Sequence, residues 1–182
     1  MTLTETELKG LFIIEPKVFS DSRGYFMETY NSNVFKDAGI NNIWIQDNQS
    51  RSTYGVIRGL HFQTNPKAQA KLVRVLEGKI LDVAVDLRKE SKTFGEWFSI
   101  ELSAENKKQL LVPRGFAHGF SVLSKNATVF YKCDNLYSPE SEMSINVFDK
   151  TLNIDWKIEE NEAIISEKDQ NNNPLSSLTY SF

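Results

Sequence analysis

The sequence contains few of the residues that build disulfides, metal sites and membrane spans. Cys133 is the only cysteine, so no intramolecular disulfide can form, and we expect a reducing, cytoplasmic location. No apolar run approaches the roughly 20 residues of a membrane helix, and residues 1–7 lack the basic and apolar regions of a signal peptide. The only histidines, His61 and His118, lack the short His-x-His or His-x-x-x-His spacing of many metal sites.

The charge balance excludes one class of partner and leaves another open. There are 21 basic and 24 acidic side chains, and the net charge of -3 gives no nucleic-acid footprint. A small anionic ligand remains compatible with this balance, because a local group of Arg23, Arg58, Lys71 and Lys168 suits phosphate oxygens. No glycine-rich phosphate loop is present, so side chains would have to hold any nucleotide.

Short apolar runs separated by Gly, Pro, Asn and Asp predict an all-β protein. The length of 182 residues fits one domain over 1–182. One helix is predicted over 32–38, begun by Asn31 or Ser32 and ended by Gly39. The dipeptide Glu77-Gly78 is typical of a tight hairpin turn. Strands are predicted over 11–14, 25–30, 43–47, 56–62, 71–76, 79–87, 96–102, 110–112, 116–123 and 127–134, a spacing that favours a sandwich or barrel.

His61, Lys71 and Tyr131 lie on three of these predicted strands. A base, a fixed cation and a phenol form the set of groups that moves a proton beside a carbonyl. Residues two apart share a strand face, so all three would project among apolar neighbours. Those neighbours are Ile57 and Gly59 for His61, Val73 and Val75 for Lys71, and Val129 and Cys133 for Tyr131. Two alternatives stay open: a register shifted by one would place Lys71 on the surface, and a buried tyrosine can be purely structural.

Five ordered motifs, residues 21–29, 46–52, 55–63, 69–75 and 112–120, resemble the dTDP-4-dehydrorhamnose 3,5-epimerase family. The resemblance implies a cupin-type jelly-roll (double-stranded β-helix) barrel with short peripheral helices. It implies a homodimer that acts without metal or organic cofactor on a dTDP-linked 4-keto-6-deoxy sugar, within dTDP-L-rhamnose biosynthesis. It also implies that His61 is the base, Asp169 its orienting partner, Lys71 the cation beside the C4 oxygen and Tyr131 the acid on the opposite face.

The same resemblance assigns the substrate contacts. They fall on Arg23, Phe26, Glu28, Gln46, Asn48, Arg58, His118, Tyr137, Glu142 and Lys168, with Tyr137 stacking on thymine. In the family, the contacts around Arg23 and Phe26 come from the partner subunit.

Four alternatives are consistent with parts of the sequence. A mono-epimerase of C3 or C5 needs the same base, lysine and phenol. A 3,4-ketoisomerase also needs a histidine base, although the arrangement of Lys71 and Tyr131 argues against it. A non-catalytic binding module needs Arg23 and Arg58 but not the His61–Asp169 pair. A metal-dependent cupin oxygenase would use the two histidines and a carboxylate as ligands.

Overall fold

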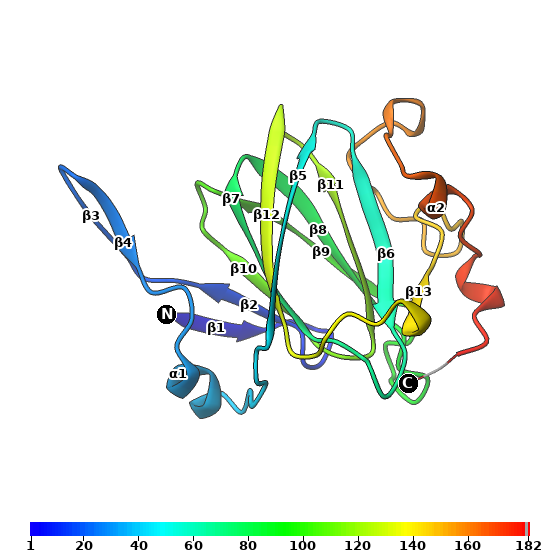
Figure 1. Ribbon diagram of the computed structural model, residues 1–182, viewed down its shortest axis with the longest axis horizontal. Helices are drawn as coiled ribbons and strands as arrows, with labels where there is room; N and C mark the ends of the chain where they lie inside the picture. Colours follow the sequence, from blue (N-terminus) through cyan, green and yellow to red (C-terminus); the bar gives the residue numbers. More distant parts are fainter. Residues whose placement is uncertain (181) are drawn as a thin grey trace.

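Two antiparallel sheets face each other in the computed structural model, which describes residues 1–180 and 182 (Figure 1). The first sheet has the order β1-β2-β10-β7-β12-β5 and consists of Thr2–Glu5, Phe12–Glu15, Gln109–Val112, Lys71–Glu77, Asn126–Cys133 and Gln46–Thr53. The second has the order β13-β6-β11-β8-β9 and consists of Glu142–Ser144, Ile57–Gln63, Phe116–Val122, Lys79–Asp86 and Trp97–Ser103. This is the all-β jelly roll that the sequence predicts.

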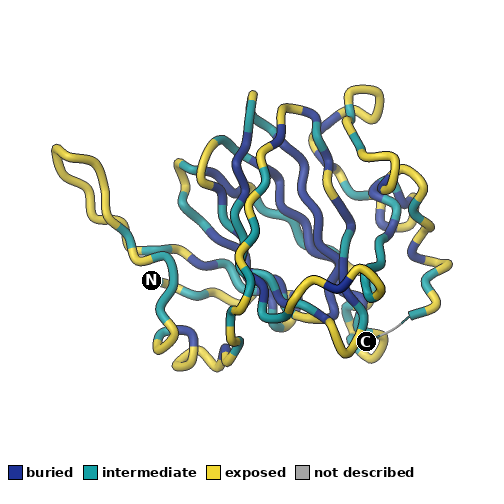
Figure 2. The backbone as a smooth tube through the Cα atoms, in the orientation of Figure 1, coloured by how far each residue is buried: buried dark blue, intermediate teal, exposed yellow. Residues whose placement is uncertain are grey.

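The main hydrophobic core lies between the two sheets. Alternate residues of each strand point inward, as the two-residue period of a strand requires. Val73 and Val129 enter this core from the first sheet, and Ile80, Ala84 and Phe120 enter it from the second. Phe98, Ile100 and Leu102 of β9 lie on one face of their strand and pack in this core as well. Figure 2 shows the resulting buried centre of the facing strands.

The outer face of each sheet is covered by a different part of the chain. Residues 145–180 pack on the second sheet, where Trp156 and Leu175 bury the outward side chains of β6 and β8. The α1 helix, Ser32–Asp37, packs Phe35 against the outer face of the first sheet. The remaining helices are short: α2 spans Glu167–Gln170, and 3-10 turns cover Pro139–Ser141, Glu160–Glu162 and Leu175–Ser177. In the described part of the chain, no helix is long and apolar enough to cross a membrane.

The α1 helix begins and ends where the sequence predicts. The Asn31 side chain accepts hydrogen bonds from the backbone N–H groups of Asn33 and Val34, which satisfies donors that a helix start leaves free. Gly39 follows the last turn with φ +81°, a conformation that favours glycine at a helix end. The prediction of this helix is confirmed.

A two-stranded hairpin projects from the body of the molecule (Figure 1). It consists of β3, Val18–Asp21, and β4, Gly24–Met27. Phe19, Tyr25 and Phe26 are exposed on it, and Phe26 has 70% of its surface accessible. Apolar side chains gathered on a projecting hairpin are typical of an interaction surface.

Three sequence predictions differ from the structure. Glu77-Gly78 is not a hairpin turn, because β7 belongs to the first sheet and β8 to the second. Gly78 carries the chain across at φ +74°, and a Cβ there would lie 1.9 Å from the carbonyl oxygen of Asn126. The strand predicted over 43–47 begins only at Gln46 and continues to Thr53. Strands β1, β3 and β13 were not predicted, because polar or exposed residues occupy most of their positions.

Candidate active site

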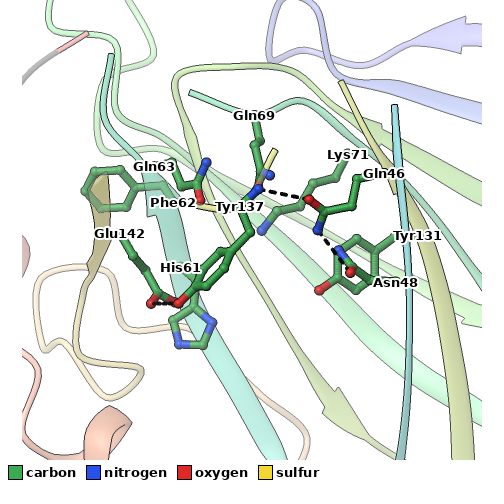
Figure 3. Close-up of a pocket in the computed structure, with 10 residues that line it drawn as sticks. All are labelled: Gln46, Asn48, His61, Phe62, Gln63, Gln69, Lys71, Tyr131, Tyr137 and Glu142. Carbon is green, nitrogen blue, oxygen red and sulfur yellow. Dashed lines mark hydrogen bonds between the residues drawn. The ribbon is translucent and has the colours of Figure 1, made fainter. Parts of the chain in front are cut away.

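A cavity of about 290 Å³ opens between the sheets, at the end of the barrel where β7 begins and β12 ends. It is lined by Gln46, Asn48, His61, Phe62, Gln63, Gln69, Lys71, Tyr131, Tyr137 and Glu142 (Figure 3). A smaller cavity of about 120 Å³ shares His61, Lys71 and Tyr131 with it and adds Ser50, Arg58, His118, Gly119 and Phe120. The three residues that the sequence singles out therefore come together around one polar space.

An irregularity in β6 turns His61 toward this space. His61 pairs with His118 on β11 and Arg58 pairs with Phe120, so three steps along β6 match two steps along β11. The extra residue is a β-bulge, and it places Arg58 and His61 on the same inner face. The prediction that His61 shares its face with Ile57 is wrong, because Ile57 packs on the outer face of the second sheet, among the side chains that Trp156 and Leu175 cover.

The bulge depends on a close approach of two backbones. Gly59 has φ +146°, and a Cβ built on it would lie 2.7 Å from Cα of Gly119 on β11. A Cβ on Gly119 would in turn lie 2.7 Å from the carbonyl oxygen of Arg58. Neither position has room for a side chain, which explains the glycine at each. Gly59 is therefore a residue within strand β6, Ile57–Gln63, and not part of a turn.

His61 is paired with Asp169 of the α2 helix. Its Nε2 lies 2.7 Å from Oδ1 of Asp169, whose side chain is only 5% exposed. Burial by itself raises the pKa of Asp169 and is the largest single effect, but the hydrogen bond and charge of His61 and the other hydrogen bonds to this carboxylate together outweigh it, so the net pKa is lowered. An ionised carboxylate only accepts hydrogen bonds, so Nε2 of His61 carries the hydrogen. In the neutral ring, Nδ1 is then free to take a proton.

Lys71 and Tyr131 occupy neighbouring strands on the inner face of the first sheet. Tyr131 of β12 pairs with Val73 of β7, and the Lys71 ammonium lies 5.9 Å from the centre of the Tyr131 ring. Burial lowers the pKa of Lys71 and raises the pKa of Tyr131, because each charged form loses solvation. The alternative that Lys71 lies on the outer surface is wrong, since it lines both cavities.

No ion pair engages Lys71 within residues 1–180 and 182. Burial of an ammonium group without a partner is unfavourable, and an anion that enters the cavity offsets this cost. Tyr131 keeps its proton at neutral pH because its pKa is raised, so it is available as a proton donor. The cavity thus presents one base, one cation and one acid.

Tyr137, Glu142 and Lys168 form a hydrogen-bonded group at the mouth of the larger cavity. The Tyr137 hydroxyl donates to Oε2 of Glu142 over 2.8 Å, and Nζ of Lys168 donates to the same oxygen over 2.5 Å. Burial raises the pKa of Glu142 and is the largest single effect, but the hydrogen bonds from Lys168 and Tyr137 and the nearby positive charge together outweigh it, so the net pKa is lowered. Gln46 accepts the backbone N–H of Tyr137 and donates to Asn48 (Figure 3). These predicted substrate contacts therefore form one connected hydrogen-bonded group that spans the cavity from the second sheet to the first.

Several lining residues were not singled out from the sequence. Gln63 accepts the N–H of Ser138 and donates to the carbonyl oxygen of Leu136, so it fixes the loop that carries Tyr137. Gln69 also lines the cavity. Asp82, a fully buried residue of β8, binds His118 behind the smaller cavity. The two glutamines lie within the motifs of the resemblance, but Asp82 lies outside them, and an isolated aspartate in an apolar strand gave no signal.

Three predicted substrate contacts lie away from the cavity within this chain. Arg23 lies at the tip of the projecting hairpin, where it pairs with Asp21 at 2.6 Å. Phe26 is on the same hairpin, and Glu28, just after it, accepts a hydrogen bond from Asn31. The fold of one chain therefore does not bring this part of the predicted site to His61.

The facing sheets and the polar space between them define the class of cupin-type jelly-roll enzymes. Within this class, the chain belongs to the dTDP-4-dehydrorhamnose 3,5-epimerase family, whose sequence model matches residues 5–177. A family member from Shigella flexneri is 49% identical over 181 residues, which are 99% of each chain.

Solved structures agree with this assignment. The dTDP-4-dehydrorhamnose 3,5-epimerase of Elizabethkingia anophelis is 56% identical, with a TM-score of 0.95 over 99% of each chain. A dTDP-6-deoxy-D-glucose-3,5-epimerase from Legionella pneumophila, solved in complex with dTDP-4-keto-L-rhamnose, is 46% identical, with a TM-score of 0.93. That comparison covers 97% of this chain and 94% of the Legionella chain.

Proposed function

We propose that this chain inverts C3 and C5 of dTDP-4-dehydro-6-deoxy-D-glucose to give dTDP-4-dehydro-L-rhamnose, a step of dTDP-L-rhamnose biosynthesis. The observation that carries the proposal is the meeting of the His61–Asp169 pair, Lys71 and Tyr131 around one space, in a chain of this family. The Legionella relative, solved with the 4-keto-L-rhamnose nucleotide, supports the substrate.

Proton removal falls to His61. The C4 ketone of the sugar acidifies the hydrogens on C3 and C5, so a base can remove either proton and leave the electron pair on the C4 oxygen. Nδ1 of His61 takes the proton while the Nε2–H group stays hydrogen-bonded to Asp169, and the ionised carboxylate then stabilises the imidazolium. The Lys71 ammonium faces the C4 oxygen, where its charge stabilises the developing enolate.

Inversion requires the proton to return on the other face of the ring. When the enolate collapses, the C4 carbonyl forms again and the Tyr131 hydroxyl supplies the proton for the new C–H bond. Burial raises the pKa of Tyr131. The positive charge of Arg58, which lines the smaller cavity with Tyr131, partly offsets this rise and so eases the loss of the phenol proton. Proton exchange with solvent then resets His61 and Tyr131.

Nucleotide binding completes the assignment, and here we propose a homodimer. Tyr137, Glu142 and Lys168 lie at the mouth, where the dTDP group enters. The hairpin of one subunit supplies Arg23, Phe26 and Glu28 to the cavity of its partner. The exposed aromatic side chains of this hairpin support that arrangement, because they are costly in a free monomer.

Proton NMR in deuterated water tests the activity. The 4-keto-6-deoxy sugar nucleotide is incubated with the protein, and a reductase traps the inverted product. We expect loss of the proton signals at both C3 and C5 and formation of the L-rhamnose nucleotide, and we expect His61→Asn to abolish both. Exchange at one carbon only identifies a mono-epimerase, a carbonyl moved to C3 identifies a ketoisomerase, and an unexchanged substrate rejects the proposal.

A mixing experiment tests the shared site. His61→Asn and Arg23→Ala are each expected to be inactive alone. If the hairpin serves the partner, a mixed dimer has one intact site, so random 1:1 exchange of subunits restores about a quarter of wild-type activity. A mixture that stays inactive after proven subunit exchange contradicts the arrangement.

A further inference from the structure

A second histidine–aspartate pair lies beside the first. His118 of β11 is the cross-strand neighbour of His61, and its Nε2 lies 2.8 Å from Oδ1 of Asp82 on β8. The His118 side chain is 7% exposed and that of Asp82 is fully buried. Among the described residues, Oδ2 of Asp82 has no hydrogen-bond partner. The single bond to His118 is therefore the main polar contact of a buried carboxylate.

The pairing determines which nitrogen of His118 faces the smaller cavity. A carboxylate only accepts hydrogen bonds, so Nε2 carries the ring hydrogen. Nδ1 then keeps its lone pair in the neutral ring, and no hydrogen bond engages it within residues 1–180 and 182. Because His118 lines the cavity of about 120 Å³, Nδ1 is the polar atom that it can offer to a ligand.

The cavity otherwise has many donors and few acceptors. Arg58 and Lys71 present only N–H groups, and Nδ1 of His61 is required for the C–H proton. A sugar ring brings hydroxyl groups, each of which donates one hydrogen bond and needs an acceptor when it is removed from water. The Tyr131 hydroxyl is assigned to proton donation, so Ser50 and His118 are the remaining polar side chains that line this cavity, and of these two only His118 is fixed by a buried partner.

We propose that Asp82 is a positioning residue, which holds His118 in the tautomer whose Nδ1 accepts a hydrogen bond from a hydroxyl group of the sugar ring. The proposal rests on the proposed function, since it places the sugar between His61 and His118. The two pairs then have different roles. Asp169 orients His61 to remove a proton from carbon, and Asp82 orients His118 to accept a hydrogen bond from a ring hydroxyl. Asp82 touches no reacting atom in this scheme and acts through the imidazole.

The test is Asp82→Asn, measured at pH 8, where an ordinary imidazole is neutral. An amide can donate to Nε2 as well as accept from it, so the tautomer is no longer imposed. With 15N-labelled histidine, the two imidazole rings give two sets of NMR signals, and His118→Gln assigns them. We expect Asp82→Asn to move the His118 signals toward the other tautomer and to leave those of His61 in place.

The kinetic expectation is a loss of binding more than of chemistry. A bound hydroxyl group that loses its acceptor lowers kcat/KM by roughly 10- to 100-fold, and mainly through KM. In the His118→Gln background, Asp82→Asn should add less than about twofold, because both act through one bond. Asp86→Asn is the matched control: Asp86 is also fully buried on β8 but bonds to Arg88 instead, and we expect unchanged KM and histidine signals.

Two results overturn the proposal. Unchanged His118 signals in Asp82→Asn show that the carboxylate does not set the tautomer. An equal loss of kcat/KM with and without His118 shows that Asp82 acts elsewhere. The most direct other route is Lys71, because the negative charge of Asp82 raises the pKa of this ammonium group. If the variant does not fold, titration of the wild type decides: dTDP-glucose, but not dTDP, should shift the His118 signals. These signals can be read whether or not the wild type epimerises, so failure of the proposed function is recognised separately by the washout assay.

Discussion

Tyr131→Phe should separate proton washout from inversion. The change removes the hydroxyl that we propose returns the proton, while His61, Asp169 and Lys71 keep their contacts. A positioned general acid contributes roughly 10²- to 10⁴-fold, which is about 3–5 kcal/mol of transition-state stabilisation. We expect inversion to fall by this factor and washout at the carbon atoms to fall by less than about tenfold, because washout needs only the base and the cation.

The structure limits the effect of this change on folding. No hydrogen bond engages the Tyr131 hydroxyl within residues 1–180 and 182, and even one such bond would contribute only about 0.5–1.5 kcal/mol. The phenyl ring retains its packing against the main core. A large drop in the midpoint of thermal unfolding would therefore contradict our description of this side chain and would make the kinetic result uninformative about the acid.

The assay follows both processes in one sample. Proton NMR in deuterated water gives the rate of signal loss at C3 and C5, and trapping by the reductase gives the rate of inversion. Tyr137→Phe is the matched control, because it removes a hydroxyl at the cavity mouth whose hydrogen bond, within the described part of the chain, goes to Glu142. We expect it to change KM by less than about tenfold and to leave the ratio of washout to inversion unchanged. Equal losses of washout and inversion in Tyr131→Phe would refute the assigned roles.

Three further changes test other parts of the structure. Lys71→Met should lower kcat by roughly 10²- to 10³-fold while the unfolding temperature stays equal or rises, because a buried, unpaired ammonium is removed; a lower unfolding temperature would argue against its isolation. Gly78→Ala should lower the free energy of unfolding in urea by at least about 2 kcal/mol, through its positive φ and its clash with Asn126, whereas Gly39→Ala, with a similar φ and open space, should cost less. Burial alone raises the pKa of Asp86, but hydrogen bonds led by Arg88 lower it to about 2. The ionised carboxylate should therefore add about 2 kcal/mol to the free energy of unfolding above pH 4, and this contribution should disappear as the pH falls toward 2. If Asp86→Asn left the acid side of the stability–pH curve unchanged, the assignment would be contradicted.

The sequence predicts most strands, because their alternation reflects burial against a core. The strands β6 to β12 lie within one or two residues of their predicted bounds, and the α1 helix follows from its Asn31 cap and Gly39 end. Pairing is less predictable than existence. Glu77-Gly78 correctly indicates a change of direction, but a local turn signal cannot show that the next strand joins the opposite sheet.

The candidate site was partly predictable for the same reasons. Lys71 and Tyr131 project inward on regular strands, so the two-residue period places them correctly. The period fails for His61, because the bulge shifts it onto the face of Arg58. Asp169 and Lys168 lie beyond the barrel strands, so periodicity carries no information about them, and only the family resemblance identifies them. Asp82 becomes visible only when β8 and β11 are placed side by side.

The bulge in β6 also constrains how this chain can change its length. In a regular pleat, residues three apart face opposite sides, so His61 faces the cavity together with Arg58 only because of the extra residue between them. A variant that lost the bulge but kept the same number of residues would turn His61 toward the outer face of the second sheet, although every active-site side chain remained in its sequence. A deletion or insertion in β6 should therefore be tolerated only where it leaves Arg58 and His61 on one face, as the removal of one residue between them, together with the bulge, would do.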